Sequence, residues 1–206
     1  MGERLLMTIL DGHLMGPSNH IWLYHHWFGY DARFLAMLAD VVYTHKLYRP
    51  SAGLSDAVKA FLSYDMEGFH ITDSRDDRNY MAFVDMAAKK AVWFDMDKWR
   101  RKIGWATGES TAAYADFVDA IDSSAQLGTI DAVEATLAHY LVDYRTYNFS
   151  AEKYPELLQE AVAVAERQAN FLRRRLGPDD DFTKFWEDYA DKLKTMLAEV
   201  VARRLG

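Results

Sequence analysis

The sequence predicts an all-α fold, a single domain over residues 1–206 with about seven or eight helices. Two observations carry this prediction. Apolar residues recur at intervals of three and four along most of the chain, and the runs of β-branched residues that are typical of strands are nearly absent. No repeat, linker or low-complexity segment divides the chain. We therefore expect one compact helical domain.

The first half of the chain predicts four helices. The first covers about residues 3–14 and ends at the glycine and proline of "MGPSN". The second runs over about 20–48 and carries an apolar stripe formed by Trp27, Tyr30, Phe34, Leu38 and Val41. Ser55 is expected to cap a third helix, and a fourth follows through "YMAFVDMAAKKAVWF".

The second half resumes the helical pattern after an irregular segment, "MDKWRRKIGWATGES". One helix is expected over "STAAYADFVDAIDSSAQ", and the next covers "TIDAVEATLAHYLVDYRTY" after a break at Gly128. Ser150 is expected to cap the helix over 151–176, whose acidic start and arginine-rich end suit the helix dipole. "GPDDD" ends that helix with acids that act as caps, and a last amphipathic helix reaches about Arg203.

The net charge and the absence of cysteine disfavour or exclude several classes of partner and site. The chain has 24 basic and 31 acidic residues, a net charge of −7, which disfavours binding to nucleic acid or to an anionic membrane. A neutral or cationic small-molecule substrate is more compatible with this negative charge than an anionic partner. The chain contains no cysteine, which excludes disulfides, thiolate metal sites and a cysteine nucleophile.

The apolar segments are too short for targeting or membrane insertion. The run near the amino terminus is shorter than a signal peptide needs, and no window approaches the ~20 apolar residues that span a bilayer. We therefore expect a soluble protein in the cytoplasm.

Three clusters could carry chemistry. In "YHHWFGYD", His26, Trp27 and Tyr30 offer polar rings that could stack on a flat substrate, although a core helix with hydrogen-bonded histidines explains them equally well. In "EGFH", Glu67 and His70 have the spacing of one half of a di-metal site, but the chain contains no second Glu-x-x-His. An exposed helix end explains that pair more simply.

The third cluster is "HYLVDYRTY". On a helix, His139 and Asp143 would lie one turn apart, so that the carboxylate orients the imidazole as a general base, with Tyr147 a further turn away. Helical surfaces produce such pairs often by chance. The sequence lacks a phosphate-binding loop, a Gly-x-Ser-x-Gly elbow and a His-Glu-x-x-His zinc motif.

The order of several segments resembles the TenA/thiaminase II family of the heme-oxygenase-like superfamily. The segments are "ILDGHL", the aromatic "WLYHHWFGYDARFLAMLA", the stretch from "STAAY" to "HYLVDY", and "FTKFWEDYADKL". The resemblance spans nearly the whole chain with loose motifs. It implies a heme-oxygenase-like bundle and a small-molecule enzyme, and it adds Tyr114 and Trp186 to the substrate-binding candidates.

The departures from that family concern its chemistry. His139 or a neighbour stands where the catalytic cysteine is expected, which excludes a cysteine-dependent thiaminase. His26 stands where the family has its substrate-binding aspartate, Trp27 where it has the following tyrosine, and Phe182 where it has its catalytic glutamate.

Three hypotheses about function follow. The first is a metal-free acid–base enzyme acting on a planar heterocyclic or aromatic substrate, with His139, Asp143 and Glu67 as catalytic groups and no cofactor. The second is an iron- or heme-dependent oxidase of the same superfamily that uses Glu67, His70 and His139 as ligands. The third is a helical subunit or adaptor that has lost the catalytic residues.

Assembly into a homodimer or higher homo-oligomer is also expected. Aromatic residues make up 14% of the chain and there are nine methionines, more apolar surface than a modest helical domain needs. The expected contacts are the long second helix and "WFDMDKWRRKIGW", whose tryptophans lie among basic residues. An irregular loop packed on its own core explains that segment about equally well.

Overall fold

A computed structural model describes residues 4–10, 20–27, 31–45, 54–64, 68–72, 79–85, 87–96, 98–99, 110–149 and 153–205. Their architecture is mixed α/β, so the expected all-α, heme-oxygenase-like bundle is wrong, and with it the resemblance to the TenA family. A six-stranded sheet in the order β3-β2-β1-β4-β5-β6 occupies segments that the sequence assigned to helices.

The strands are β1 (Leu5–Leu10), β2 (His20–His25), β3 (Phe69–Ile71), β4 (Tyr80–Asp85), β5 (Lys90–Asp95) and β6 (Arg145–Asn148). The two central strands, β1 and β4, run parallel, and all other neighbours in the sheet are antiparallel.

Central strand β1 shows why the helix expected over 3–14 fails. All six residues of "LLMTIL" are buried, because β1 has a strand on each side and apolar cover on both faces. A short, continuously apolar run is typical of a central strand. The same run also fits a buried helix, so its periodicity alone does not distinguish the two.

The segment expected as a helix over "YMAFVDMAAKKAVWF" is the hairpin of β4 and β5. Asp85 pairs with Lys90 at its closed end, and Asp85 Oδ1 accepts a hydrogen bond of 2.8 Å from the Ala88 N–H within the turn. Lys89 takes the left-handed conformation there, with φ of 56°. The tight turn, stabilised by a side-chain acceptor, permits two strands where a continuous helix was expected.

The described helices are α1 (Asp31–His45), α2 (Leu54–Tyr64), α4 (Ser110–Ala125), α5 (Ile130–Tyr140), α6 (Tyr154–Leu176) and α7 (Asp181–Leu205). The helices expected over 110–126 and 151–176 and the last amphipathic helix are confirmed, with shifted ends. The long helix expected over 20–48 is instead strand β2 followed by helix α1. None of the helices in the described ranges is long and apolar enough to cross a membrane.

The chain divides into two compact units. The first comprises Met1–Gly29 and Leu47–Asn148, and the second comprises Tyr30–Lys46 and Phe149–Gly206. The expectation of one domain over 1–206 stays a prediction.

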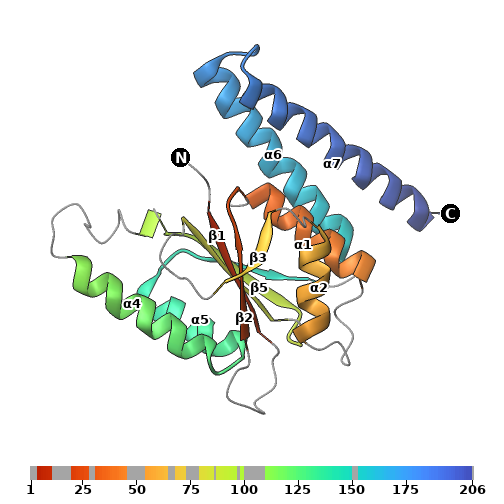
Figure 1. Ribbon diagram of the computed structural model, residues 1–206. Coiled ribbons are helices and arrows are strands. Elements are labelled where there is room, and N and C mark those ends of the chain that lie inside the picture. Colours follow the sequence, from red (N-terminus) through yellow and green to blue (C-terminus); the bar gives the residue numbers. More distant parts are fainter. Residues whose placement is uncertain are drawn as a thin grey trace. The chain divides into compact units, whose positions relative to one another are not determined.

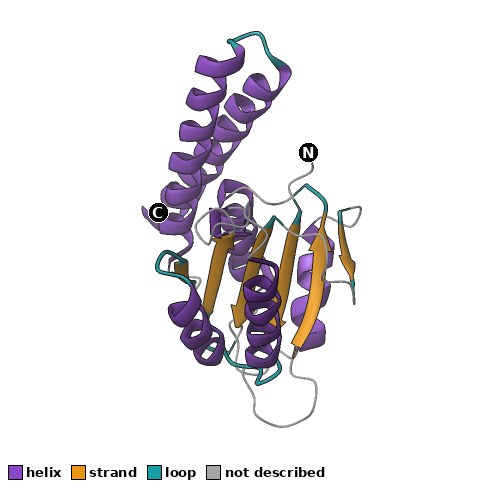
Figure 2. Cartoon of the chain, turned by 90° about the vertical axis from the view of Figure 1, so that its left-hand side faces the viewer, coloured by secondary structure: helices purple, strands orange, loops and turns teal. Residues whose placement is uncertain are grey.

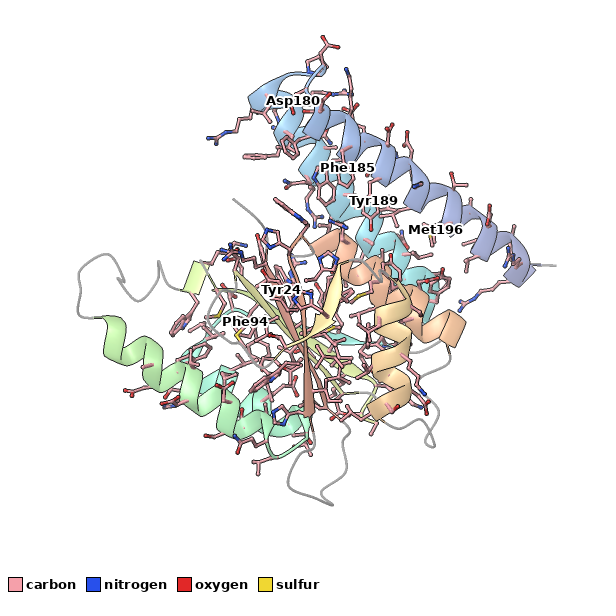
Figure 3. All side chains as sticks on the ribbon, in the orientation of Figure 1. Tyr24, Phe94, Asp180, Phe185, Tyr189 and Met196 are labelled. Carbon is pink, nitrogen blue, oxygen red and sulfur yellow. The ribbon has the colours of Figure 1, made fainter. Side chains whose placement is uncertain are left out.

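In the first unit, α4 and α5 cover one face of the sheet and α2 lies on the other (Figures 1 and 2). Every second residue of a strand points to the same face, so Leu6, Phe83 and Phe94 meet the helices α4 and α5. Phe94 contacts Phe117 of α4 edge to face, with ring centroids 6.1 Å apart (Figure 3). This core holds the α5–β6 connection against the end of β5.

In the second unit, α6 packs against both α1 and α7. Asp180 caps α7, because its Oδ1 accepts a hydrogen bond of 2.9 Å from the Phe182 N–H, as the acids of "GPDDD" predicted. Across the hairpin, the hydrogen bonds of Lys194 with Glu166 and Asp191 raise the pKa of its ammonium group. α6 and α7 thus form a helical hairpin with defined ends.

Candidate functional site

A pocket of about 390 Å³ lies in the first unit, at the end of β5. We call it the β5-end pocket. The described residues that line it come from the end of β5 and the residues after it (Trp93, Phe94, Asp95, Lys98 and Trp99) and from the link 141–145 between α5 and β6. Its volume falls within the range of small-ligand sites.

The pocket exists because β5 is longer than its neighbour β6. The ladder between them joins Lys90–Trp93 to Arg145–Asn148, so β5 runs two residues beyond its last partner. Helix α5 ends at Tyr140, and the N–H of its C-cap Leu141 donates to the Leu137 oxygen. The chain then crosses to β6 as the irregular segment 141–144, which forms the opposite wall of the pocket.

Two tryptophans are among the residues that line the pocket. Trp93 is 7% exposed and stacks on Tyr80, with ring centroids 5.7 Å apart. The Trp99 ring packs against the Phe117 ring, with ring centroids 4.2 Å apart. Within the described part of the chain, the buried Nε1 of Trp93 has no hydrogen-bond partner.

Four charged residues surround these rings, and three of them have partners. Asp95 Oδ1 accepts a hydrogen bond of 3.0 Å from the Lys98 N–H, and the Lys98 ammonium lies 3.9 Å from Asp95 Oδ2. Arg145 Nη1 lies within hydrogen-bonding distance of the Tyr147 hydroxyl, at 3.3 Å. Asp143 is exposed and, among the residues that the structure describes, forms neither an ion pair nor a hydrogen bond.

The structure separates the expected acid–base pair. Because α5 ends at Tyr140, Asp143 lies three residues beyond the helix, and the one-turn spacing with His139 does not arise. His139 is exposed, its ring meets Tyr140 edge to face at 4.9 Å, and it does not line the β5-end pocket. Tyr147 is buried in β6. Of the three residues expected to act together, only Asp143 lines the pocket.

His26, Trp27 and His70 gather elsewhere, around Tyr24 at the β2–β3 edge of the sheet (Figure 3). The Tyr24 hydroxyl lies 3.1 Å from His26 Nδ1, and its ring centroid lies 5.0 Å from that of His70. Trp27 meets His26 edge to face and is 57% exposed. These rings contact one another edge to face or at a tilt, and none of them lines the β5-end pocket.

The structure describes only some of the remaining candidates. Glu67, Tyr30 and the side chain of Tyr114 lie outside what the structure describes. Trp186 is buried in α7 of the second unit. No three histidine or acidic side chains in the described ranges are grouped so that they could hold a metal ion. The roles expected for these residues therefore stay predictions.

Most residues of the β5-end pocket were not predicted from sequence motifs. Trp93, Lys98 and Trp99 belong to the segment that was expected to form a dimer contact, and Tyr144 and Arg145 were placed inside a helix. Tryptophans interleaved with charged residues were the available signal, since that mixture is also typical of ligand pockets.

Comparison of the chain with protein-family models finds no match, and comparisons with curated proteins and with solved structures find none either.

Proposed function

We propose that this protein binds a small, flat aromatic compound carrying a positive charge in the β5-end pocket. One observation carries the proposal: the carboxylate of Asp143, which has no ion pair or hydrogen bond among the described residues, lines the same pocket as Trp93 and Trp99. Aromatic faces attract cations and flat rings, and a carboxylate adds a charge-assisted hydrogen bond.

The charges favour a cationic ligand over an anionic one. The Lys98 ammonium lies close to the Asp95 carboxylate, and Arg145 keeps its charge while it donates to the neutral Tyr147 hydroxyl; Asp143 has neither an ion pair nor a hydrogen bond among the described residues. The net charge of −7 on the whole chain also attracts cations.

The proposal concerns binding and does not include a general base. His139 and Asp143 share neither a helix nor an ion pair in the described structure, which removes the geometric support for the expected acid–base step. The sequence favoured a planar small molecule, either neutral or cationic, and Asp143 in the pocket supports the cationic alternative.

Isothermal titration with two indole compounds tests the proposal. Tryptamine carries an ammonium group and indole-3-propionate a carboxylate on similar rings, so the pair isolates the effect of charge. We expect tryptamine to bind the wild-type chain and indole-3-propionate to bind at least about tenfold more weakly. Equal binding of the two compounds, or no binding of tryptamine, would contradict the proposal.

The first prediction assigns the charge contact to Asp143. The isosteric substitution Asp143→Asn removes the charge and should weaken tryptamine binding about fivefold, the loss typical of a partly exposed charge-assisted contact. Asp119→Asn is the matched control, because Asp119 is exposed on α4 and does not line the pocket. A dissociation constant that both substitutions leave unchanged would show that Asp143 does not contact the ligand.

A further inference from the structure

The link between α5 and β6 is fixed at both ends. Leu141, at its start, is buried, and its N–H donates a hydrogen bond of 2.6 Å to the Leu137 oxygen. Arg145, at its end, is paired with Trp93 in the sheet. Only residues 142–144 lie between these two fixed points, so any movement of these three residues keeps them beside the end of β5.

Between its ends the link has few contacts that hold it in place. Among the residues that the structure describes, Val142, Asp143 and Tyr144 form no hydrogen bond and no ion pair. Tyr144 is half-buried and packs against the core of the first unit, whereas Val142 and Asp143 are exposed. Moving Val142 and Asp143 therefore breaks no hydrogen bond to a described residue, which is typical of segments that rearrange locally.

The two walls of the β5-end pocket differ in this respect. On one side, all six residues of β5, from Lys90 to Asp95, are paired with β4. On the other side, the link has no strand partner before Arg145. A ligand in the pocket would therefore meet one wall fixed by the sheet and one wall that can adjust to it.

Val142 carries an apolar side chain on the adjustable wall. Its side chain is 83% exposed, more than any other large apolar side chain described in the first unit, although Val142 lines the pocket. Moving an exposed valine from water onto an apolar surface is favourable. A flat ring held in the pocket would supply such a surface.

Asp143 follows Val142 directly, so a movement of one residue carries the other. A cation in the pocket attracts the Asp143 carboxylate, because opposite charges attract over several ångströms. The same movement can bring Val142 onto the ring of the ligand. The link thus combines a charged group that responds to the ligand with an apolar group that can cover it.

We propose that Val142 and Asp143 form a strap that closes over a cationic ring bound in the β5-end pocket. Val142 then covers the ring, while Leu141 and Tyr144 hold the ends of the strap. This inference rests on the proposed function, because the positive charge of the ligand draws Asp143 inward.

The second prediction concerns the affinity that Val142 adds. Val142→Thr keeps the shape of the side chain but replaces a methyl group with a hydroxyl group, so closure buries less apolar surface. The dissociation constant of tryptamine, measured by isothermal titration, should rise about threefold. Val201→Thr is the matched control, because Val201 is exposed on α7 and does not line the pocket. A dissociation constant that neither substitution changes would contradict the closure of the strap.

A single thiol tests directly whether the strap closes. The chain contains no cysteine, so Val142→Cys introduces the only thiol, at a position that is exposed without ligand. Iodoacetamide should alkylate this thiol readily in the free chain, and saturating tryptamine should slow the reaction at least about tenfold, because closure removes the thiol from solvent. Val201→Cys is the control, and tryptamine should leave its alkylation rate unchanged.

Failure of the strap and failure of the proposed function are distinguishable. If the Val142→Cys chain binds tryptamine in the titration but is alkylated equally fast with and without it, the strap is excluded and the proposed function stands. If the wild-type chain does not bind tryptamine, the proposed function and the strap are both overturned.

Discussion

Asp85 is a single buried residue that joins two distant segments. It ends β4 with an exposed fraction of 2%, and its Oδ1 accepts the hydrogen bond from the Ala88 N–H in the hairpin turn. Its Oδ2 accepts a hydrogen bond of 3.0 Å from the Ile130 N–H, at the first residue of α5. Thr129, at the N-cap position of α5, makes no side-chain capping bond. Asp85 therefore caps the helix from 45 residues away.

The third prediction follows from this cap. Asp85→Ala should lower the free energy of unfolding by about 2–4 kcal/mol, because it leaves two backbone donors unsatisfied in the interior. Asp85→Asn keeps one acceptor oxygen and should lose less. Urea denaturation measures both, with the exposed Asp119→Ala as the control. A loss for Asp85→Ala no larger than for the control would show that these bonds contribute little.

Gly68 illustrates a second constraint at the residue scale. A Cβ at this position would overlap the imidazole of His25, whose ring is 2% exposed. The His25 Nδ1 accepts a hydrogen bond of 3.0 Å from the Trp27 N–H, and its ring packs edge to face on Phe69 at 4.7 Å. The ring therefore has little room to move, and β3 can approach β2 only with glycine at position 68.

At the scale of elements, α6 depends on small residues. Ala161, Ala165 and Ala169 recur every four residues and are buried, which lets the helix approach its neighbours closely. Larger residues at these positions would separate the helices that α6 contacts. Alanine also has the highest helix propensity, so the same residues favour the helix itself.

The fourth prediction tests this close packing. Ala165→Leu should lower the free energy of unfolding by about 1–3 kcal/mol, since a fully packed interior has no space for three further carbon atoms. Ala198→Leu on the exposed face of α7 is the matched control and should change it by about 0.5 kcal/mol or less. Thermal or urea denaturation distinguishes the two. Equal stability of both variants would mean that α6 is packed loosely.

At the scale of the whole molecule, the second unit is discontinuous in sequence. Its helix α1 comes from residues 31–45, whereas α6 and α7 begin after residue 153. The side chains described in α1 are buried except for the half-buried Arg33 and Asp40. Since α1 packs against α6, its apolar surface depends on the end of the chain for cover.

The fifth prediction is that residues 1–148 alone do not form a stable monomer. Without α6, the apolar side chains of α1 would face water, and we expect aggregation. Light scattering and circular dichroism of the fragment, beside the full chain, measure this directly. A monomeric fragment that retains the helical signal of α1, α2, α4 and α5 would refute it.

The sequence by itself determined the long helices. α6 and α7 have 23 and 25 residues, so their apolar period repeats over many turns. Their ends also follow local rules, with arginines in the last turn of α6 and Asp180 capping α7. Such features depend on neighbours in the chain, and they can be recognised without a three-dimensional structure.

Only the tertiary structure decided the sheet, and with it the pocket. The short apolar runs "LLMTIL" and "YMAFVD" are compatible with either a helix or a strand. They form strands because they pair with each other, although they lie far apart in the sequence. The end of α5 at Tyr140 likewise depends on β6 pairing with β5. Asp143 was identified from its sequence neighbours as the partner of His139. It lines the β5-end pocket instead, because non-local strand pairing overrides helical spacing there.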